Sequence, residues 1–235
     1  MLTVPAMADV LSGKVSVSQV RKVELEDLLG RDPIQLDDEG LHRLLTGRRV
    51  LVTGAGGSIG SELCRQIAHY APAQLAFFEQ SEFALYRIEQ EFSASFPEVG
   101  IACVVGDVKD EATLAAAFAT HRPEVVFHAA AYKHVPLMEN ENAWEAVRNN
   151  VLGTLCVAEA AQRHGTGEFV FISTDKAVNP TNVMGTTKRI AEMVCQGLQQ
   201  PGGTRFVMVR FGNVLGSNGS VIPKFREQIA RGGPV

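Results

Sequence analysis

The sequence has few cysteines, and their arrangement excludes several classes of protein. Only four are present, at positions 64, 103, 156 and 195, and none of them forms a C-x-x-C pair. Zinc sites, iron–sulfur clusters and secreted disulfide scaffolds depend on closely spaced or paired cysteines. We therefore expect no bound metal, and we expect the domain to work in a reducing, cytoplasmic environment.

Strong charge of one sign and long apolar runs are also lacking. The formal net charge is only −4, and no cluster of lysine or arginine stands out. Nucleic acids and anionic membranes attract proteins mainly through basic patches, so neither is expected as a partner. No segment approaches the roughly 18 consecutive apolar residues of a membrane-spanning helix. We therefore expect no direct membrane insertion by this chain.

From residue 48 onward, short apolar runs alternate with longer helical patterns. The predicted strands cover residues 50–53, 75–79, 101–105, 125–128, 169–172 and 206–210. The predicted helices cover residues 59–69, 82–96, 111–120, 143–164 (with a break at Gly153 left open) and 185–199. Such alternation is typical of a parallel sheet covered on both faces. Because six strands complete a dinucleotide-binding sheet, we predict an α/β fold with a Rossmann-type, doubly wound parallel sheet.

Residues 1–47 have a different composition. Glycines and a proline separate short polar pieces that hold too few apolar residues for a core of their own. We predict a connector segment over residues 1–47 that packs on a dinucleotide-binding domain over residues 48–235. The last residues, Gly232, Gly233 and Pro234, form a turn signal, and no further element is predicted after them.

A glycine-rich loop joins the first predicted strand to the first predicted helix. Gly54, Gly57 and Gly60 stand in a T-G-x-x-G-x-x-G arrangement, with Ser58 and Ile59 at the helix start. Glycines let the backbone approach a pyrophosphate, whose charge is met by N–H groups at the helix N-terminus. An ordinary glycine-rich turn is the alternative, but the strand–loop–helix context favours a dinucleotide site.

Further cofactor contacts are predicted after the next strands. Glu79 ends the second strand, where an acidic side chain binds ribose hydroxyls and repels a 2′-phosphate, so NAD is favoured over NADP. Glu79 could instead only complement the dipole of the following helix. Asp107 and Val108 follow the third strand and could hold the adenine edge, while Ala129 and Ala130 follow the fourth and would let the cofactor lie close to the backbone.

The chemical groups are predicted in the segment Ser173-Thr174-Asp175-Lys176 and on the helix after it. Met184 precedes Lys188 by four residues, the spacing at which a reductase carries tyrosine and lysine on one helical face. A thioether exchanges no protons, so Asp175 and Lys176 are the candidate acid and base. Asp175 could otherwise be a turn or cap residue and Lys176 a solvated side chain, and Met184 is read as core filling.

Five motifs together resemble one family. They are T-G-A-G-G-S-I-G, H-A-A-A-Y-K-H-V-P, N-N-V-x-G-T, S-T-D-K-A-V-N-P-T-N-V-M-G-T-T-K and R-F-G-N-V-L-G-S. They are similar to the extended short-chain dehydrogenases of bacterial polysaccharide biosynthesis, the UDP-N-acetylglucosamine 4,6-dehydratase family. The likeness runs from Arg48 to Val235. It implies that the chain resembles a fragment of a long, membrane-anchored form whose C-terminal segment closes over the UDP-sugar.

The resemblance also implies a mechanism. With NAD as a catalytic hydride carrier, oxidation at C4 acidifies the C5 proton, which Lys176 removes while Asp175 protonates the departing O6 hydroxyl. Thr174 and Ser173 would hydrogen-bond near O4, and Lys188 would hold the nicotinamide ribose. The base for the C4 hydroxyl stays unassigned, with Asp175 or a water held by Thr174 as candidates.

Three further residues are candidates for substrate contact. Lys133 and His134 follow the fourth strand at the carboxyl end, where open α/β sheets bind ligands, although they could simply cap a loop. Asn213 could touch the substrate, whereas Arg210 before it is as well explained by a structural ion pair.

Two other functions compete with the dehydratase. A UDP-sugar 4-epimerase shares the hydride step but normally needs the tyrosine that Met184 replaces. A catalytically silent NAD-binding module is the alternative from another class. The UDP-sugar is the expected partner, and the oligomeric state stays open, a homo-oligomer included.

Overall fold

The computed structural model describes residues 2–3, 21–22, 37–214 and 221–234, and it divides the chain into two compact units, Met1–Asp37 and Asp38–Val235. In the first unit, β1 (Leu2–Thr3) pairs antiparallel with β2 (Arg21–Lys22). The remainder of the predicted connector up to residue 36 lies outside the described residues, and so do residues 215–217 of the last motif.

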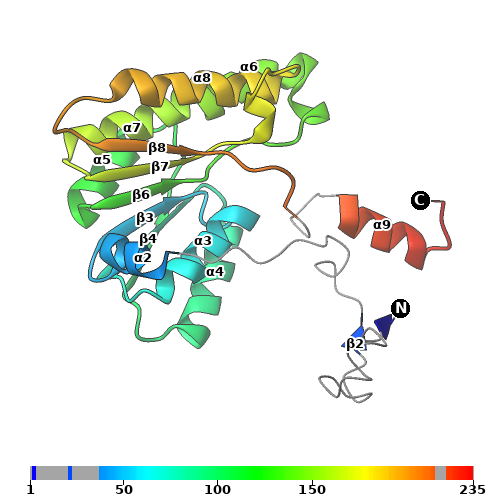
Figure 1. The fold of residues 1–235 in the computed structure, drawn as a ribbon, viewed down its shortest axis with the longest axis horizontal. Coiled ribbons are helices and arrows are strands. Elements are labelled where there is room, and N and C mark those ends of the chain that lie inside the picture. The colour runs from blue at the N-terminus through cyan, green and yellow to red at the C-terminus, as the bar shows by residue number, and fades with distance from the viewer. Residues whose placement is uncertain (1, 4–20, 23–36, 215–220, 235) are drawn as a thin grey trace, which may run out of the picture. The chain divides into compact units, whose positions relative to one another are not determined.

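The second unit is built on a six-stranded parallel sheet (Figure 1). Its strands are β3 (Arg49–Thr53), β4 (Gln74–Glu79), β5 (Ile101–Val105), β6 (Val125–His128), β7 (Glu168–Ile172) and β8 (Arg205–Val209). The spatial order β5-β4-β3-β6-β7-β8 is that of a dinucleotide-binding sheet. The predicted Rossmann-type fold is therefore confirmed. Successive strands are added on one side of β3 up to β5 and on its other side from β6 to β8. This switch point, between the parallel strands β3 and β6, places the ligand-binding crevice at their carboxyl ends.

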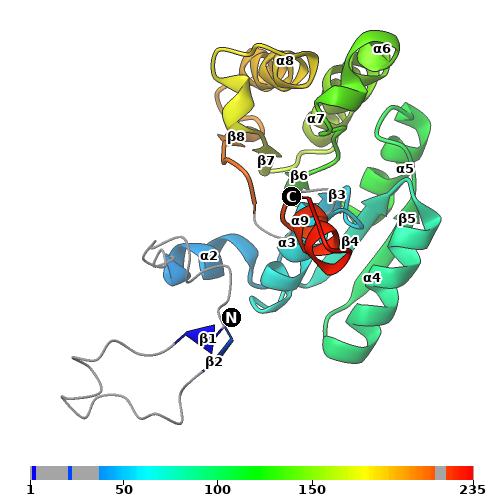
Figure 2. The same cartoon turned by 90° about the vertical axis from the view of Figure 1, so that its right-hand side faces the viewer.

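Helices cover both faces of the sheet, as Figures 1 and 2 show. One face carries α2 (Asp38–Leu45), α3 (Ser58–Ala68) and α4 (Glu82–Ser95). The other carries α5 (Glu111–His121), α7 (Gly153–Arg163) and α8 (Val183–Leu198). Each face has its own apolar core, centred on Phe77 and Phe92 with α2–α4 and on Phe118 and Phe169 with α5–α8. Because both faces are buried, the strands read as continuous apolar runs.

Two helices are additional to those predicted. Helix α2 lies within the segment expected to be a connector, but Leu45 is buried in the core beneath the sheet, with Leu41 and Leu44 packed against it. The sequence-based prediction missed this helix because most of its residues are polar and because it contains Gly40, a poor helix former. Helix α9 (Val221–Ala230) follows the last strand. Among the described residues, no helix is long and apolar enough to span a membrane.

The long helix predicted over residues 143–164 changes its winding midway. It consists of α6 (Ala143–Val147), a π-helical turn (Arg148–Leu152) and α7, which begins at Gly153. Short 3₁₀ turns, Pro136–Met138 and Asn140–Asn142, precede it. A Cβ added at Gly153 would lie 2.8 Å from the Val108 side chain, so this glycine allows a close approach of helix and loop. π-Turns inside α-helices often accompany functional sites.

Candidate active site

The glycine loop depends on missing side chains at two positions. Gly54 has φ +68°, and a Cβ there would lie 2.7 Å from the backbone nitrogen of Ala130. A Cβ on Gly60 would lie 2.0 Å from the carbonyl oxygen of Gly54. The loop after β3, the start of α3 and the loop after β6 are thus in close contact through their backbones.

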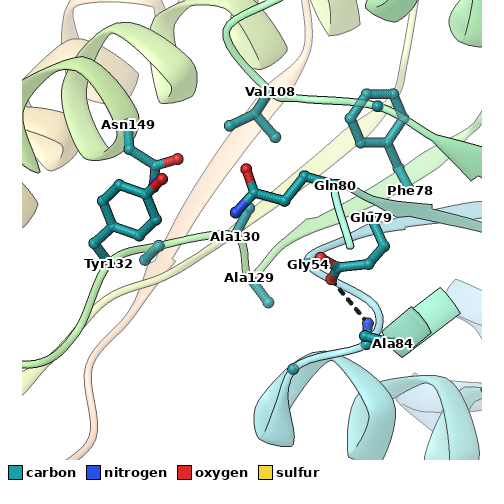
Figure 3. Close-up of a pocket in the computed structure, with 14 residues that line it drawn as sticks. Gly54, Phe78, Glu79, Gln80, Ala84, Val108, Ala129, Ala130, Tyr132 and Asn149 are labelled. Carbon is teal, nitrogen blue, oxygen red and sulfur yellow. Dashed lines mark hydrogen bonds between the residues drawn. The ribbon is translucent and has the colours of Figure 1, made fainter. Parts of the chain in front are cut away.

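A cavity of about 280 Å³ adjoins this loop. Figure 3 shows residues that line it, with Glu79 and Gln80 on one side and Tyr132 and Asn149 on the other. The Glu79 side chain is buried, and its carboxylate accepts hydrogen bonds from the backbone N–H of Gly56 (3.0 Å) and of Ser81 (3.0 Å). Each carboxylate oxygen keeps a second lone pair for a ligand hydroxyl.

The other cofactor candidates are divided between this cavity and its neighbours. Gly54, Gly57, Val108, Ala129 and Ala130 line it. The Asp107 carboxylate instead accepts from the backbone N–H of Lys109 (2.9 Å) and pairs with the same residue's ammonium group (2.7 Å).

A second cavity, of about 590 Å³, shares Gly57 with the first and includes the start of α3 in its lining. Ser58, Ile59 and Gly60 line it together with Lys133 and His134, so the predicted pyrophosphate and substrate contacts meet there.

A third cavity, of about 210 Å³, gathers most of the predicted chemical groups. Its lining includes Lys133, Ser173, Thr174, Lys176, Met184, Lys188 and Asn213. Ala129 and Tyr132 line all three cavities, which therefore share one wall. Asp175 is exposed beside the third cavity.

Hydrogen bonds join Asp175 to its neighbours. It accepts from the Thr174 hydroxyl (2.9 Å) and from the Lys176 ammonium group (3.1 Å), which also donates to the side-chain oxygen of Asn213 (3.1 Å). The bonds from Lys176 and then Thr174 lower the pKa of Asp175 below its usual value. At neutral pH this carboxylate is ionised, so it accepts a proton before it can donate one.

Lys188 lies buried beside these groups. Its Nζ stands 4.0 Å from the centre of the Phe171 ring, and its side chain is only 5% exposed. Burial lowers the pKa of Lys188 to about 7, because the ammonium form loses its hydration. Met184, one turn earlier on α8, is buried in a small cluster with Met138 and Ala146 while its side chain also lines the third cavity. Its role as core filling is compatible with this packing.

Several buried polar residues around the site had no role in the sequence-based prediction. His128 lies between the hydroxyls of Thr53 (2.6 Å) and Thr154 (3.0 Å). Because Thr154 donates to the carbonyl of Asn150 (2.6 Å), it accepts from Nε2, which assigns the proton to that nitrogen. Burial, with a smaller contribution from nearby Lys188, lowers the pKa of His128 to about 3, so the ring is neutral.

Asn150, in the π-helical turn, anchors the wall shared by the three cavities. Its amide group accepts from the backbone N–H of Tyr132 (2.8 Å) and donates to the carbonyl of the same residue (3.0 Å). It also donates to the Thr187 hydroxyl of α8 (3.0 Å). The sequence signal for this anchor is an asparagine pair within an apolar helical pattern, and the signal for His128 is a polar residue that ends an apolar strand.

Fold and cavities together define a Rossmann-type domain of the extended short-chain dehydrogenase/reductase class. A family model described as "Polysaccharide biosynthesis protein" matches residues 50–235. The chain belongs to this family, which confirms the resemblance drawn from its motifs.

Two curated relatives match at different distances. The chain is 53% identical over 233 residues to the capsular polysaccharide biosynthesis protein CapD of Staphylococcus aureus, covering 98% of this chain and 39% of CapD. It is 34% identical over 193 residues to the inverting UDP-N-acetylglucosamine 4,6-dehydratase of Campylobacter jejuni, covering 80% of this chain and 56% of that enzyme. The chain thus spans about two fifths to just over half of these relatives.

Solved structures agree with the fold. Pen from Bacillus thuringiensis superposes with a TM-score of 0.73 at 34% identity, covering 79% of this chain and 56% of Pen. A UDP-glucose 4-epimerase of Thermus thermophilus, solved as a complex with NAD, gives a TM-score of 0.66 at 26% identity, covering 80% of this chain and 64% of the epimerase.

Proposed function

We propose that this chain is the NAD-binding and catalytic part of a 4,6-dehydratase acting on UDP-N-acetylglucosamine. The observation that carries the proposal is the hydrogen-bonded group of Thr174, Asp175 and Lys176 beside a cavity where Met184 replaces a tyrosine. The relative from C. jejuni, named for this reaction, supports the substrate class.

The residues around the first two cavities fit NAD. The glycine loop is packed so closely that a Cβ at Gly54 or Gly60 would collide with the neighbouring backbone, so the loop borders the first cavity as nearly bare backbone. The Glu79 carboxylate is held at the wall of the same cavity, where it would bind ribose hydroxyls and repel a 2′-phosphate. The chemistry that bound NAD would supply at this site is reversible hydride storage, for the hydride lost from C4 of the sugar and regained at C6. Lys188, at the third cavity, would contact the nicotinamide ribose.

Thr174 and Asp175 would handle the proton of the C4 hydroxyl. The Thr174 hydroxyl already donates to the Asp175 carboxylate, so it accepts the O4 proton while passing its own to Asp175. Asp175 thereby becomes the protonated acid that the next step needs. It delivers this proton to O6, which departs as water.

Lys176 would first release one ammonium proton to solvent, then remove the C5 proton, and return it after the double bond accepts the hydride at C6. Asn213 accepts a hydrogen bond from the Lys176 ammonium group and so holds it over the cavity. The protons balance, because the one lost from O4 leaves with O6 and the one removed from C5 comes back, exchanging with solvent on the way.

Substitution of Lys176 tests this assignment. In the longest form of the protein that its gene encodes, Lys176→Ala should slow elimination about 10²–10⁴-fold while oxidation at C4 continues, so reduced nicotinamide accumulates with a trapped 4-keto sugar. Asp175→Asn should suppress both steps. Arg205→Ala, at the opposite end of β8, is the control. Elimination by Lys176→Ala at the wild-type rate contradicts the mechanism.

A UDP-sugar 4-epimerase is the second candidate, favoured by the NAD-bound epimerase among similar structures. Product analysis separates the two functions, because an epimerase yields a C4 epimer that keeps O6, whereas a dehydratase loses water. Binding of NAD without turnover of any UDP-sugar would leave a silent dinucleotide-binding module.

A further inference from the structure

A buried carboxylate on α8 has no part in the chemistry described above. The Glu192 side chain is 1% exposed and has three partners. Ser173 donates its hydroxyl proton to it (2.6 Å), Arg210 contacts both of its oxygens (2.7 Å from Nε), and Arg189 donates to it (3.0 Å). Burial opposes ionisation, but the hydrogen bonds from Arg210, Ser173 and Arg189 outweigh burial and lower the pKa of Glu192 to about 2.

Two of these partners, Ser173 and Arg210, belong to the segments that carry the Thr174–Lys176 group and Asn213. Ser173 directly follows β7, and Arg210 directly follows β8. Beyond the strand ends the two segments stay paired, since the backbone N–H of Ser173 donates to the carbonyl of Val209 (2.7 Å) and that of Asp175 to Phe211 (3.1 Å). Glu192 binds one side chain from each segment in the middle of this pairing.

The pairing ends at the reacting groups themselves. Lys176 follows Asp175 on the first segment, and Asn213 lies two residues after Phe211 on the second. The Lys176 ammonium group donates a hydrogen bond to the Asn213 side chain (3.1 Å). A shift of the segment after β8 would therefore move Asn213 and change where Lys176 points. Misplacement by about 1 Å is enough to cost roughly 10²-fold in rate.

Glu192 also determines whether the Ser173 hydroxyl can donate or only accept a hydrogen bond from a ligand. A hydroxyl has a single proton, and here Ser173 gives it to the Glu192 carboxylate. Toward the third cavity Ser173 therefore presents only lone pairs, which suit an O–H or N–H of the ligand and not a carbonyl or an oxyanion.

Stability alone is a weak explanation for this cluster. Buried ion pairs contribute little net stability, because desolvation offsets their attraction, and apolar side chains of similar shape often serve as well. We propose that Glu192 is a positioning residue: it aligns residues 210–213 with Asp175 and Lys176, and it turns Ser173 into an acceptor for a ligand donor. The kinetic part of this proposal rests on the proposed dehydratase function, whereas the structural part does not.

The test compares Glu192→Gln, the double variant Glu192→Gln with Arg210→Gln, and Glu168→Gln. The double variant removes the charges of Glu192 and Arg210 and leaves that of Arg189, whose side chain is 40% exposed and therefore solvated. It thus separates positioning from the cost of an unpaired buried charge. Glu168 is the matched control, because it pairs with Arg205 (2.7 Å) across the same two strands at their other ends. All variants are made in the longest form encoded by the gene. Melting temperature, kcat and KM for the UDP-sugar, and hydrogen–deuterium exchange of the peptide covering residues 173–177 are measured.

We expect the double variant to melt close to the wild type while its kcat falls about 10- to 100-fold and its 173–177 peptide exchanges faster. Glu192→Gln should show the same losses with a lower melting temperature, and Glu168→Gln should show neither. Wild-type kcat and exchange in the double variant overturn the proposal. If the wild type does not dehydrate UDP-N-acetylglucosamine, the proposed function fails, and exchange alone decides the role of Glu192.

Discussion

The two halves of the sheet form their ligand-facing surfaces in different ways. In the half made by β3, β4 and β5, the surface is largely backbone, brought close by glycines whose Cβ atoms would collide with carbonyl and amide groups. In the half made by β6, β7 and β8, it consists of side chains held by buried polar partners such as Asn150 and Glu192. The first half should therefore be sensitive to added atoms, and the second to lost hydrogen bonds and charges.

The largest effect should come from an added atom in the first half. In Gly60→Ala, the new Cβ would lie 2.0 Å from the Gly54 carbonyl oxygen, so the loop has to shift. Overpacking of this kind costs about 1–3 kcal/mol, which corresponds to roughly 10- to 100-fold weaker NAD binding. Titration calorimetry measures the loss. Gly197→Ala, with open space around its Cβ, is the control, and equal NAD affinity of both variants would break the comparison.

In the second half, the buried charge of Lys188 should make stability depend on pH. Its folded-state pKa is about 7, against an unfolded value of 10.5, so the unfolded chain holds more protons between these values and wild-type stability rises with pH there. Lys188→Met removes the charge. The dinucleotide-free variant should be more stable by a few kcal/mol below pH 7, since each pH unit of displacement is worth about 1.4 kcal/mol.

This stability gap should shrink as the pH rises from 7 toward 10.5. Denaturant unfolding at several pH values measures it, with Lys224→Met, at an exposed position, as the control. A gap that stays constant across this range argues against a buried ammonium group at position 188.

Glu79 lies in the half of the sheet whose ligand-facing surface is largely backbone, yet it would contact the ligand through its side chain. It therefore tests whether a lost side chain matters in this half as well. Glu79→Ala should weaken NAD binding about tenfold and reduce the preference over NADP, because the carboxylate no longer meets the ribose hydroxyls or repels a 2′-phosphate. Glu82→Ala, in the first turn of α4, tests whether the helix dipole explains the effect. Tighter binding of NADP by the wild type would overturn the assignment.

The smallest effect is expected for Met184→Tyr. Met184 packs against Met138 and Ala146, yet it also borders the third cavity, into which a tyrosine ring could extend. We expect a loss of about 1 kcal/mol in unfolding free energy and unchanged products of the sugar reaction. Thermal melting and product analysis measure these, with Met193→Tyr, an exposed position on the same helix, as the control. A fold that no longer forms contradicts the prediction.

The same contrast explains how much could be predicted from sequence. The strands and the glycine loop follow from local patterns, because apolar runs and glycine spacing carry the information along the chain. The motifs likewise brought Thr174, Lys176, Lys188 and Asn213 to one cavity. Each of these features depends on residues close in sequence or on a family likeness.

The features that could not be predicted depend on contacts between residues that are far apart in the sequence. Glu192 has the ordinary appearance of a charged residue on a helix, and only the convergence of Ser173 and Arg210 makes it a buried junction. The lowering of the Asp175 pKa likewise depends on where Lys176 and Thr174 point, which the sequence does not give. The π-helical turn likewise carries no periodic signal, since a single extra residue per turn blurs the apolar stripe on which prediction relies.

The wall shared by the three cavities makes the binding of their occupants interdependent. Ala129 borders all three, and a larger side chain there, as in Ala129→Val, would remove volume from the proposed dinucleotide and sugar sites at once. By thermodynamic linkage, a ligand that moves this wall changes the affinity of its neighbour, and the neighbour changes its affinity by the same factor. Under the proposed function, specificity for the dinucleotide and specificity for the sugar are therefore not separately adjustable traits at this position.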